Sequence, residues 1–139
     1  DHKLFIIGEN KENCMMFINP EVISVSEETE LDVEGCLSYP DMFIRLARPK
    51  QVEAKWYDEE LKEQSGSFEG YTARCFLHEF DHLYGVVYKD KVSRLKWDRA
   101  RTKKDKITKQ RNKLMAYLQS AQSTINQVEL RGQEVAAED

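Results

Sequence analysis

The chain has 139 residues, of which 40% are hydrophobic and 33% charged, and this composition predicts one globular domain with a core of its own. Its longest apolar runs, such as residues 15–18, are too short to cross a bilayer. The net charge of −4 is unevenly distributed, because residues 1–88 carry 8 Lys/Arg and 18 Asp/Glu whereas residues 89–113 carry 12 Lys/Arg and 3 Asp. The basic segment 89–113, with a formal charge of +9, is the one feature of the composition that indicates a charged partner.

The beginning of the chain predicts short strands. Residues 4–7 and 15–18 are apolar runs of strand length, separated by a polar, turn-prone stretch. We expect Asn19-Pro20 to break the second run before a further strand at residues 22–25. An acidic loop is expected at residues 27–32.

The next segment, EGCLSYP at residues 34–40, is expected to be irregular, because Gly35 permits unusual backbone angles and Pro40 lacks a donor. Residues 43–47 predict a strand. Residues 52–56 alternate apolar and polar side chains, which is the pattern of a half-buried strand.

After a turn at residues 58–60, the strand at residues 61–68 is expected to return antiparallel, and a helix is expected from about Gly70. Apolar residues recur there with helical spacing, and Gly85 is a good residue to end the helix. Strands followed by a buried helix predict an α+β fold.

A second, long amphipathic helix is expected from Ser93 onward. Apolar residues recur every seven positions, but Lys104 and Arg111 interrupt the second apolar row, so the segment is a poor coiled coil. Residues 132–139 are expected to form a frayed acidic tail.

Two of the three histidines lie four residues apart in CFLHEFDHLYG, residues 75–85. On a helix, His78 and His82 share one face, one turn apart, so both imidazoles can bind one metal ion. Glu79 lies about 100° round the helix from His78, too far to be a third ligand but close enough to accept a proton from a water molecule at the metal. This is the HExxH arrangement of metal-dependent hydrolases.

A catalytic metal site usually has a third protein ligand. The metzincin motif would place a histidine six residues after His82, but that position is Tyr88. The acidic residues that follow lie in an increasingly basic segment. Cys75 shares the helix face, yet it lies roughly 10 Å along the axis from His82, too far for both to bind one ion.

The remaining candidates are two further cysteines. The three cysteines of the chain form an odd set without disulfide-framework spacing, which is typical of a reducing cytoplasm. Cys14 lies in an apolar strand and is expected in the core. Cys36 lies in an irregular loop that can face the helix from outside, so Cys36, His78 and His82 form the best candidate triad. An ordinary buried thiol is the alternative for Cys36.

The motifs EGCLSYP and HEFDHLYG (residues 78–85) closely resemble two of the three signature motifs of peptide deformylases. ARCF before the first histidine and the predicted strand pair between the motifs are also similar, and the resemblance extends from about Leu4 to about Lys113. It implies antiparallel strands packed around a central metal-binding helix. It also implies removal of the N-terminal formyl group from nascent polypeptides that begin with formyl-methionine, in the cytoplasm of a bacterium, in an organelle, or in a cell infected by a bacterial virus.

The resemblance also implies a role for each site residue. Cys36, His78 and His82 would bind the metal, Glu79 would be the catalytic acid and base, and the backbone N–H of Leu37 would stabilise the oxyanion. Fe²⁺ is the expected metal, with Zn²⁺, Ni²⁺ or Co²⁺ as substitutes. By analogy, three charged residues would orient the ligands: Glu34, Arg48 and Asp81. Plausible lining of the pocket for the methionine side chain is Tyr39, Phe43, Tyr71 and Cys75.

One departure concerns the first family motif, GxGxAAxQ, whose glutamine hydrogen-bonds the reacting oxygen. No such stretch occurs here, and the first glutamine, Gln51, stands in another context. Because Asp1 opens almost directly on a predicted core strand, we expect a chain that lacks its N-terminal portion, with a catalytic domain at residues 1–92 and a basic helix with its tail at residues 93–139. A naturally reduced form is the alternative.

The basic segment occupies the place of a C-terminal helix that docks on the ribosome in bacterial relatives, which implies contact with ribosomal RNA. The alternative is that the basic segment is only a solvated helix face that balances the acidic residues 1–88. Two other functions stay open: a general HExxH metallopeptidase with a third ligand other than Cys36, and a degenerate deformylase-like module that binds ribosomes without catalysis.

Overall fold

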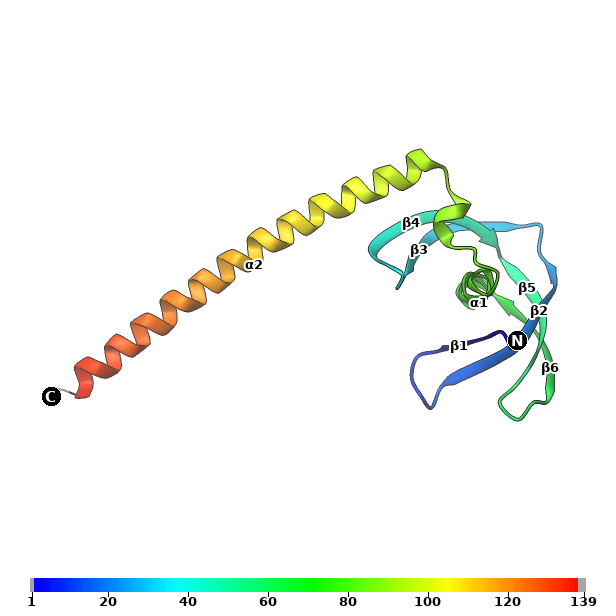
Figure 1. The fold of residues 1–139 in the computed structure, drawn as a ribbon, viewed down its shortest axis with the longest axis horizontal. Helices are drawn as coiled ribbons and strands as arrows, with labels where there is room; N and C mark the ends of the chain where they lie inside the picture. The colour runs from blue at the N-terminus through cyan, green and yellow to red at the C-terminus, as the bar shows by residue number, and fades with distance from the viewer. Residues whose placement is uncertain (1, 138–139) are drawn as a thin grey trace. The chain divides into compact units, whose positions relative to one another are not determined.

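The computed structural model describes residues 2–137 and divides the chain into two units, Asp1–Trp97 and Asp98–Asp139. The described part of the first unit contains antiparallel strands, one helix and a 3₁₀ turn (Figure 1). The strands are β1 (Leu4–Gly8), β2 (Cys14–Val25), β3 (Thr29–Cys36), β4 (Tyr39–Pro49), β5 (Gln51–Tyr57) and β6 (Glu63–Glu69). They form a four-stranded sheet in the order β1-β2-β5-β6 and a separate β3–β4 hairpin.

Helix α1 (Gly70–Leu83) packs against both groups of strands. In Figure 1 it is seen nearly end-on, with the β3–β4 hairpin on one side and β1 on the other. Its apolar residues recur three and four positions apart, which gathers them on one face. The core is formed by Phe5, Phe17, Val52, Ala54 and Trp56 from the sheet and Ala73, Phe76 and Leu77 from the helix. The predicted α+β fold, with antiparallel strands around the HExxH helix, is confirmed.

Strand β2 corrects one prediction, because Asn19-Pro20 does not end a strand. The strand continues through both residues, and its register against β5 shifts between Ile18 and Glu21. Asn19 has a φ of 47°, so the extra residue is accommodated in a β-bulge. A sequence that looks like a strand break is therefore a bend within one strand.

The β3–β4 hairpin corrects two more predictions. The expected acidic loop at residues 27–32 is already part of β3 from Thr29 onward, because β3 pairs with β4 from Thr29–Pro49 to Cys36–Tyr39. Residues 34–36 are extended, with a register shift between Glu34 and Cys36. Cys36 therefore stands at the end of a strand, directly before a tight turn.

Helix α1 ends at Leu83, and Gly85 follows two residues later with a φ of 72°, as predicted for a glycine that terminates the helix. The short η1 turn (Tyr88–Lys91) then leads to α2 (Arg94–Ala137). Residues 132–137 are helical, so the expected fraying from Gly132 is wrong for them, and residues 138–139 lie outside the described part. None of the described helices is long and apolar enough to span a membrane.

Candidate metal centre

Three side chains converge where the end of β3 meets the C-terminal half of α1. The Sγ of Cys36 lies 3.4 Å from the Nε2 of His82, and the Nε2 atoms of His78 and His82 are 3.2 Å apart. The ligand atoms of all three residues lie within 4.8 Å of one another. The candidate triad from the sequence is thus one cluster in space.

The donor set fits a divalent metal ion. Tetrahedral zinc with nitrogen at about 2.0–2.1 Å and sulfur at about 2.3 Å holds its ligand atoms roughly 3.3–3.6 Å apart, close to the 3.2 and 3.4 Å seen here. One thiolate and two imidazoles suit iron, zinc, nickel and cobalt alike. The geometry therefore supports a metal site without selecting the metal.

His78 is oriented by Glu34, which lies on β3. The Nδ1–H of His78 donates to Oε2 of Glu34 over 3.0 Å, because an ionised carboxylate can only accept. The Nε2 atom is then left free to bind a metal ion. This hydrogen bond with Glu34 raises the pKa of His78. Burial raises the pKa of the Cys36 thiol, but hydrogen bonds from Ser38 and His78 outweigh burial and lower it, which favours the thiolate form.

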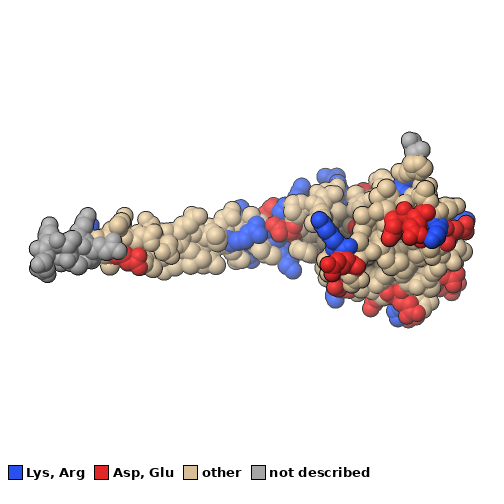
Figure 2. All heavy atoms as spheres, turned by 90° about the horizontal axis from the view of Figure 1, so that it is seen from below, with Lys and Arg blue, Asp and Glu red and all other residues tan. Residues whose placement is uncertain are grey.

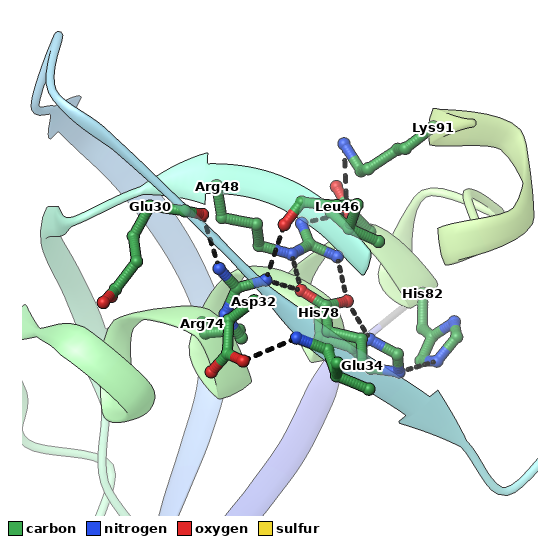
Figure 3. A network of polar contacts seen from close by, with 11 residues as sticks. Glu30, Asp32, Glu34, Leu46, Arg48, Arg74, His78, His82 and Lys91 are labelled. Carbon is green, nitrogen blue, oxygen red and sulfur yellow. Dashed lines mark hydrogen bonds and ion pairs between the residues drawn. The ribbon is translucent and has the colours of Figure 1, made fainter. Parts of the chain in front are cut away.

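Glu34 itself is 5% exposed and stands between two arginines (Figure 3). Arg48 donates through Nε to Oε1 at 2.5 Å and through Nη2 to Oε2 at 3.0 Å, and Arg74 donates through Nη1 to Oε1 at 2.8 Å. Burial alone would raise the pKa of Glu34, but hydrogen bonds from His78 and Arg48 lower it to about 2. The carboxylate therefore stays ionised beneath the metal site.

The network continues to Asp81. Arg48 donates through Nη1 to its Oδ2 at 2.8 Å, and the Nζ of Lys91 lies 3.1 Å from the same oxygen. Every described buried side-chain nitrogen or oxygen has a hydrogen-bond partner. The three charged residues expected beside the ligands are thus joined in one network.

A cleft of about 330 Å³ opens over the three ligands. Glu79 and Leu37 line it, together with Tyr71 and Cys75 from the expected pocket. The other two pocket residues lie elsewhere, because Tyr39 packs its ring against Tyr88 and Trp97, and Phe43 is 65% exposed on the outer side of the hairpin. Helix α1 and the β3–β4 turn therefore form the walls of the cleft.

Two residues of this region, Arg74 and Tyr88, were not predicted from the sequence. Arg74 stood within the ARCF context but carried no assigned role, since arginine on a helix is usually exposed. Tyr88 was considered only as a failed ligand, yet it is 1% exposed and its ring centroid lies 5.9 Å from that of His78. The spacing of Arg74 one turn before His78 was the available signal, because i and i+4 share a face.

The fold and this centre define an HExxH metalloprotein whose third candidate ligand is a cysteine. The family model for polypeptide deformylase matches residues 3–98. The chain is 46% identical over 89 residues to a peptide deformylase of Zymomonas mobilis, covering 64% of this chain and 50% of that protein. The chain belongs to the peptide deformylase family.

Solved structures give the same result. A peptide deformylase from Synechococcus elongatus in complex with actinonin superposes with a TM-score of 0.66 at 36% identity, covering 73% of this chain and 56% of that one. A class I type b peptide deformylase from Acinetobacter baumannii with Met-Ala-Ser bound superposes with a TM-score of 0.61 at 29% identity, covering 65% and 62%. The chain thus spans half to under two thirds of the length of these relatives.

Proposed function

We propose that this chain removes the N-terminal formyl group from peptides that begin with formyl-methionine. The position of the Cys36 Sγ, 3.4 Å from the Nε2 of His82, is the observation that carries the proposal. In peptidases with an HExxH helix, the third metal ligand is a downstream histidine or acid. Here the thiolate of Cys36 would be the third ligand instead. A relative that binds Met-Ala-Ser supports a peptide of that kind in the cleft.

Cys36, His78 and His82 would hold the metal, for which we expect Fe²⁺. When bound, such an ion lowers the pKa of water and polarises the formyl oxygen. Glu79 lines the cleft beside the histidines, and we assign to its carboxylate the proton taken from the attacking water and then given to the leaving amine. Glu34, Arg48 and Asp81 would keep His78 in the tautomer that binds through Nε2.

The developing oxyanion needs a hydrogen-bond donor that is already in place. We assign the backbone N–H of Leu37 to this role, since Leu37 lines the cleft directly after Cys36. None of the residues described around the cleft carries a side-chain amide. Because loss of one such donor costs on the order of 100- to 1000-fold in rate, we expect turnover to be slow.

We propose that the pocket for the methionine side chain of the substrate is lined by Tyr71 and Cys75, which both line the cleft.

The test is formate release from formyl-Met-Ala-Ser after anaerobic loading with Fe²⁺. We expect release by the parent chain and at least about 100-fold less by Glu79→Ala with the same metal content, whereas Glu59→Ala in an exposed turn keeps the parental rate. Equal rates for parent and Glu79→Ala would refute the assigned role. Cleavage of internal peptide bonds that survives Cys36→Ser would instead indicate a general metallopeptidase. Metal binding without formate release would indicate the degenerate module.

We also propose that the basic segment 89–113 contacts ribosomal RNA, in the cytoplasm where formylated chains emerge. All of its lysines and arginines except Lys104 are exposed. In Figure 2 basic side chains gather on the part of α2 nearer its beginning, whereas acidic side chains form several separate patches on the visible face of the first unit. Phosphates would attract this helix face with a marked dependence on salt.

The test for this contact is co-sedimentation with ribosomes at increasing salt concentration. The triple variant Lys103, Lys106 and Lys109→Gln should reduce the slope of log affinity against log salt by about 2 to 3, since each phosphate contact contributes about 0.7–0.9. The matched triple variant Gln119, Ser120 and Ser123→Ala should keep the parental slope. An unchanged slope in the lysine variant would rule out this surface.

A further inference from the structure

Arg74 connects helix α1 to both strands of the hairpin that carries Cys36. It is 4% exposed and lies one helical turn before His78. Its guanidinium donates through Nη2 to the carbonyl oxygen of Glu30 at 2.7 Å and through Nη1 to the carbonyl oxygen of Leu46 at 3.1 Å, in addition to Glu34. Figure 3 shows these three contacts reaching β3 and β4 from one side chain.

The hairpin depends on such contacts because it is not part of the four-stranded sheet. Backbone hydrogen bonds hold its open end, where Lys50 N–H donates to Glu28 O and Gly70 N–H donates to Lys50 O. Cys36 stands at the opposite, turn end. The separation of the Cys36 thiol from the histidines on α1 is therefore set by side chains that cross between hairpin and helix.

Arg74 differs in this respect from Arg48. Arg48 lies on β4 and binds Glu34 and Asp81 through carboxylates only. Arg74 lies on the helix with the histidines and binds the hairpin through backbone oxygens. If Arg74 is removed, Glu34 keeps both hydrogen bonds from Arg48, so it stays ionised and keeps its bond to His78. Removal of Arg74 should therefore change the position of the β3–β4 hairpin relative to α1, because the hydrogen bonds to its backbone oxygens are lost.

We propose that Arg74 is a positioning residue that holds the Cys36-bearing β3–β4 hairpin against α1 and thereby sets the distance between the Cys36 thiol and the two histidines. This inference rests on the proposed function, in that the triad must bind metal. Arginine is suited to the role because its planar guanidinium can serve three acceptors in fixed directions, whereas lysine presents a compact ammonium group.

The test uses the full chain and Co²⁺, whose near-ultraviolet charge-transfer band reports a bound thiolate. We expect Arg74→Met to bind Co²⁺ about 10- to 100-fold more weakly, with a smaller thiolate band at saturation, and Arg74→Lys to lie between it and the parent. Arg45→Met, which changes an exposed arginine on the same hairpin, is the matched control and should leave both quantities unchanged.

Two outcomes separate this inference from the proposed function. If the parent chain binds no Co²⁺ through a thiolate, the metal site itself is refuted. If the parent binds Co²⁺ and folded Arg74→Met binds it with the same affinity and band, only the role of Arg74 is refuted. Should Arg74→Met fail to fold, the rate of amide hydrogen exchange in Arg74→Lys is measured instead. The proposal requires faster exchange at residues 30–36 and unchanged exchange in β5, and any other result refutes it.

Discussion

His78 donates its Nδ1–H to Oε2 of Glu34 over 3.0 Å, while its Nε2 faces the Nε2 of His82 at 3.2 Å. The carboxylate thus fixes both the tautomer and the direction of the ring. The same carboxylate receives hydrogen bonds from Arg48 and Arg74, so one buried charge connects the ligand with β4 and α1. A single side chain therefore affects both metal binding and folding stability.

The stability of the metal-free protein should depend on pH through Glu34. Its pKa is lowered from 4.5 to about 2 in the folded chain. A lowered pKa means that the contribution is complete above pH 4.5 and is lost as the pH falls towards 2. We expect a loss of about 3 kcal/mol across this window. His78, whose pKa is raised above 6.5, is protonated in both states there and contributes no slope.

The measurement is urea unfolding of the metal-free chain between pH 2 and pH 6. Glu34→Gln should be less stable at pH 6, because it leaves the buried guanidinium of Arg74 without its carboxylate partner and Arg48 with Asp81 alone, and it should show a flatter pH dependence. Asp58→Asn, at a half-buried position between β5 and β6, should change the slope less, because the hydrogen bonds described for the Asp58 carboxylate are exposed and none comes from a buried arginine. A slope for Glu34→Gln equal to that of the parent would show that other groups control the acid transition.

Metal-dependent stability should require Cys36. A metal that binds only the folded chain stabilises it by about 2.7 kcal/mol when its free concentration is 100 times the dissociation constant. We therefore expect added Zn²⁺ to raise the unfolding temperature of the parent chain and of Cys14→Ser. Cys14 is exposed, so its expected place in the core is wrong, and it does not line the cleft. Cys36→Ser should lose this increase, and a chelator should abolish it in all variants. An equal increase in Cys36→Ser would exclude the thiolate as a ligand.

The sequence alone was sufficient to predict those site residues whose chemistry requires a fixed spacing along the chain. His78 and His82 share a helix face because they are four residues apart, and Cys36 remained after the other cysteines were considered. Asn19-Pro20 could not be interpreted correctly, because a proline in a strand is compatible with both a break and a bulge. The pairing partner decides between the two, and it is distant in sequence.

Gly35 and Arg74 show a second limit. Gly35 was expected to adopt an unusual backbone angle, yet its φ lies outside the left-handed region. The ring of Phe43 lies where a side chain at residue 35 would be. Arg74 was given no role from the sequence, because most arginines are exposed. Both roles depend on side chains brought close by the register of the β3–β4 hairpin, which local sequence patterns do not contain.

Tyr88 should contribute to stability through one buried hydrogen bond. Its hydroxyl donates to the carbonyl oxygen of Met42 at 2.9 Å. Tyr88→Phe leaves that oxygen buried without the donor, so we expect a loss of about 1–2 kcal/mol in urea unfolding. Burial raises the pKa of Tyr88 to about 12, so the loss should be constant between pH 6 and pH 9. Tyr117→Phe, at 70% exposure, should cost nothing measurable.

Gly35→Ala should be destabilising because of one neighbour. A Cβ at this position would lie 2.9 Å from Cε1 and 3.2 Å from Cδ1 of Phe43. Since the Phe43 side chain is 65% exposed, its ring can turn away, and we expect a cost of no more than about 1 kcal/mol. In a Phe43→Ala background the cost should disappear. A double-mutant cycle in urea measures this coupling, and Co²⁺ titration of the same variants reports any displacement of Cys36. An equal cost in both backgrounds would mean that the backbone at residue 35, rather than the Phe43 ring, requires glycine.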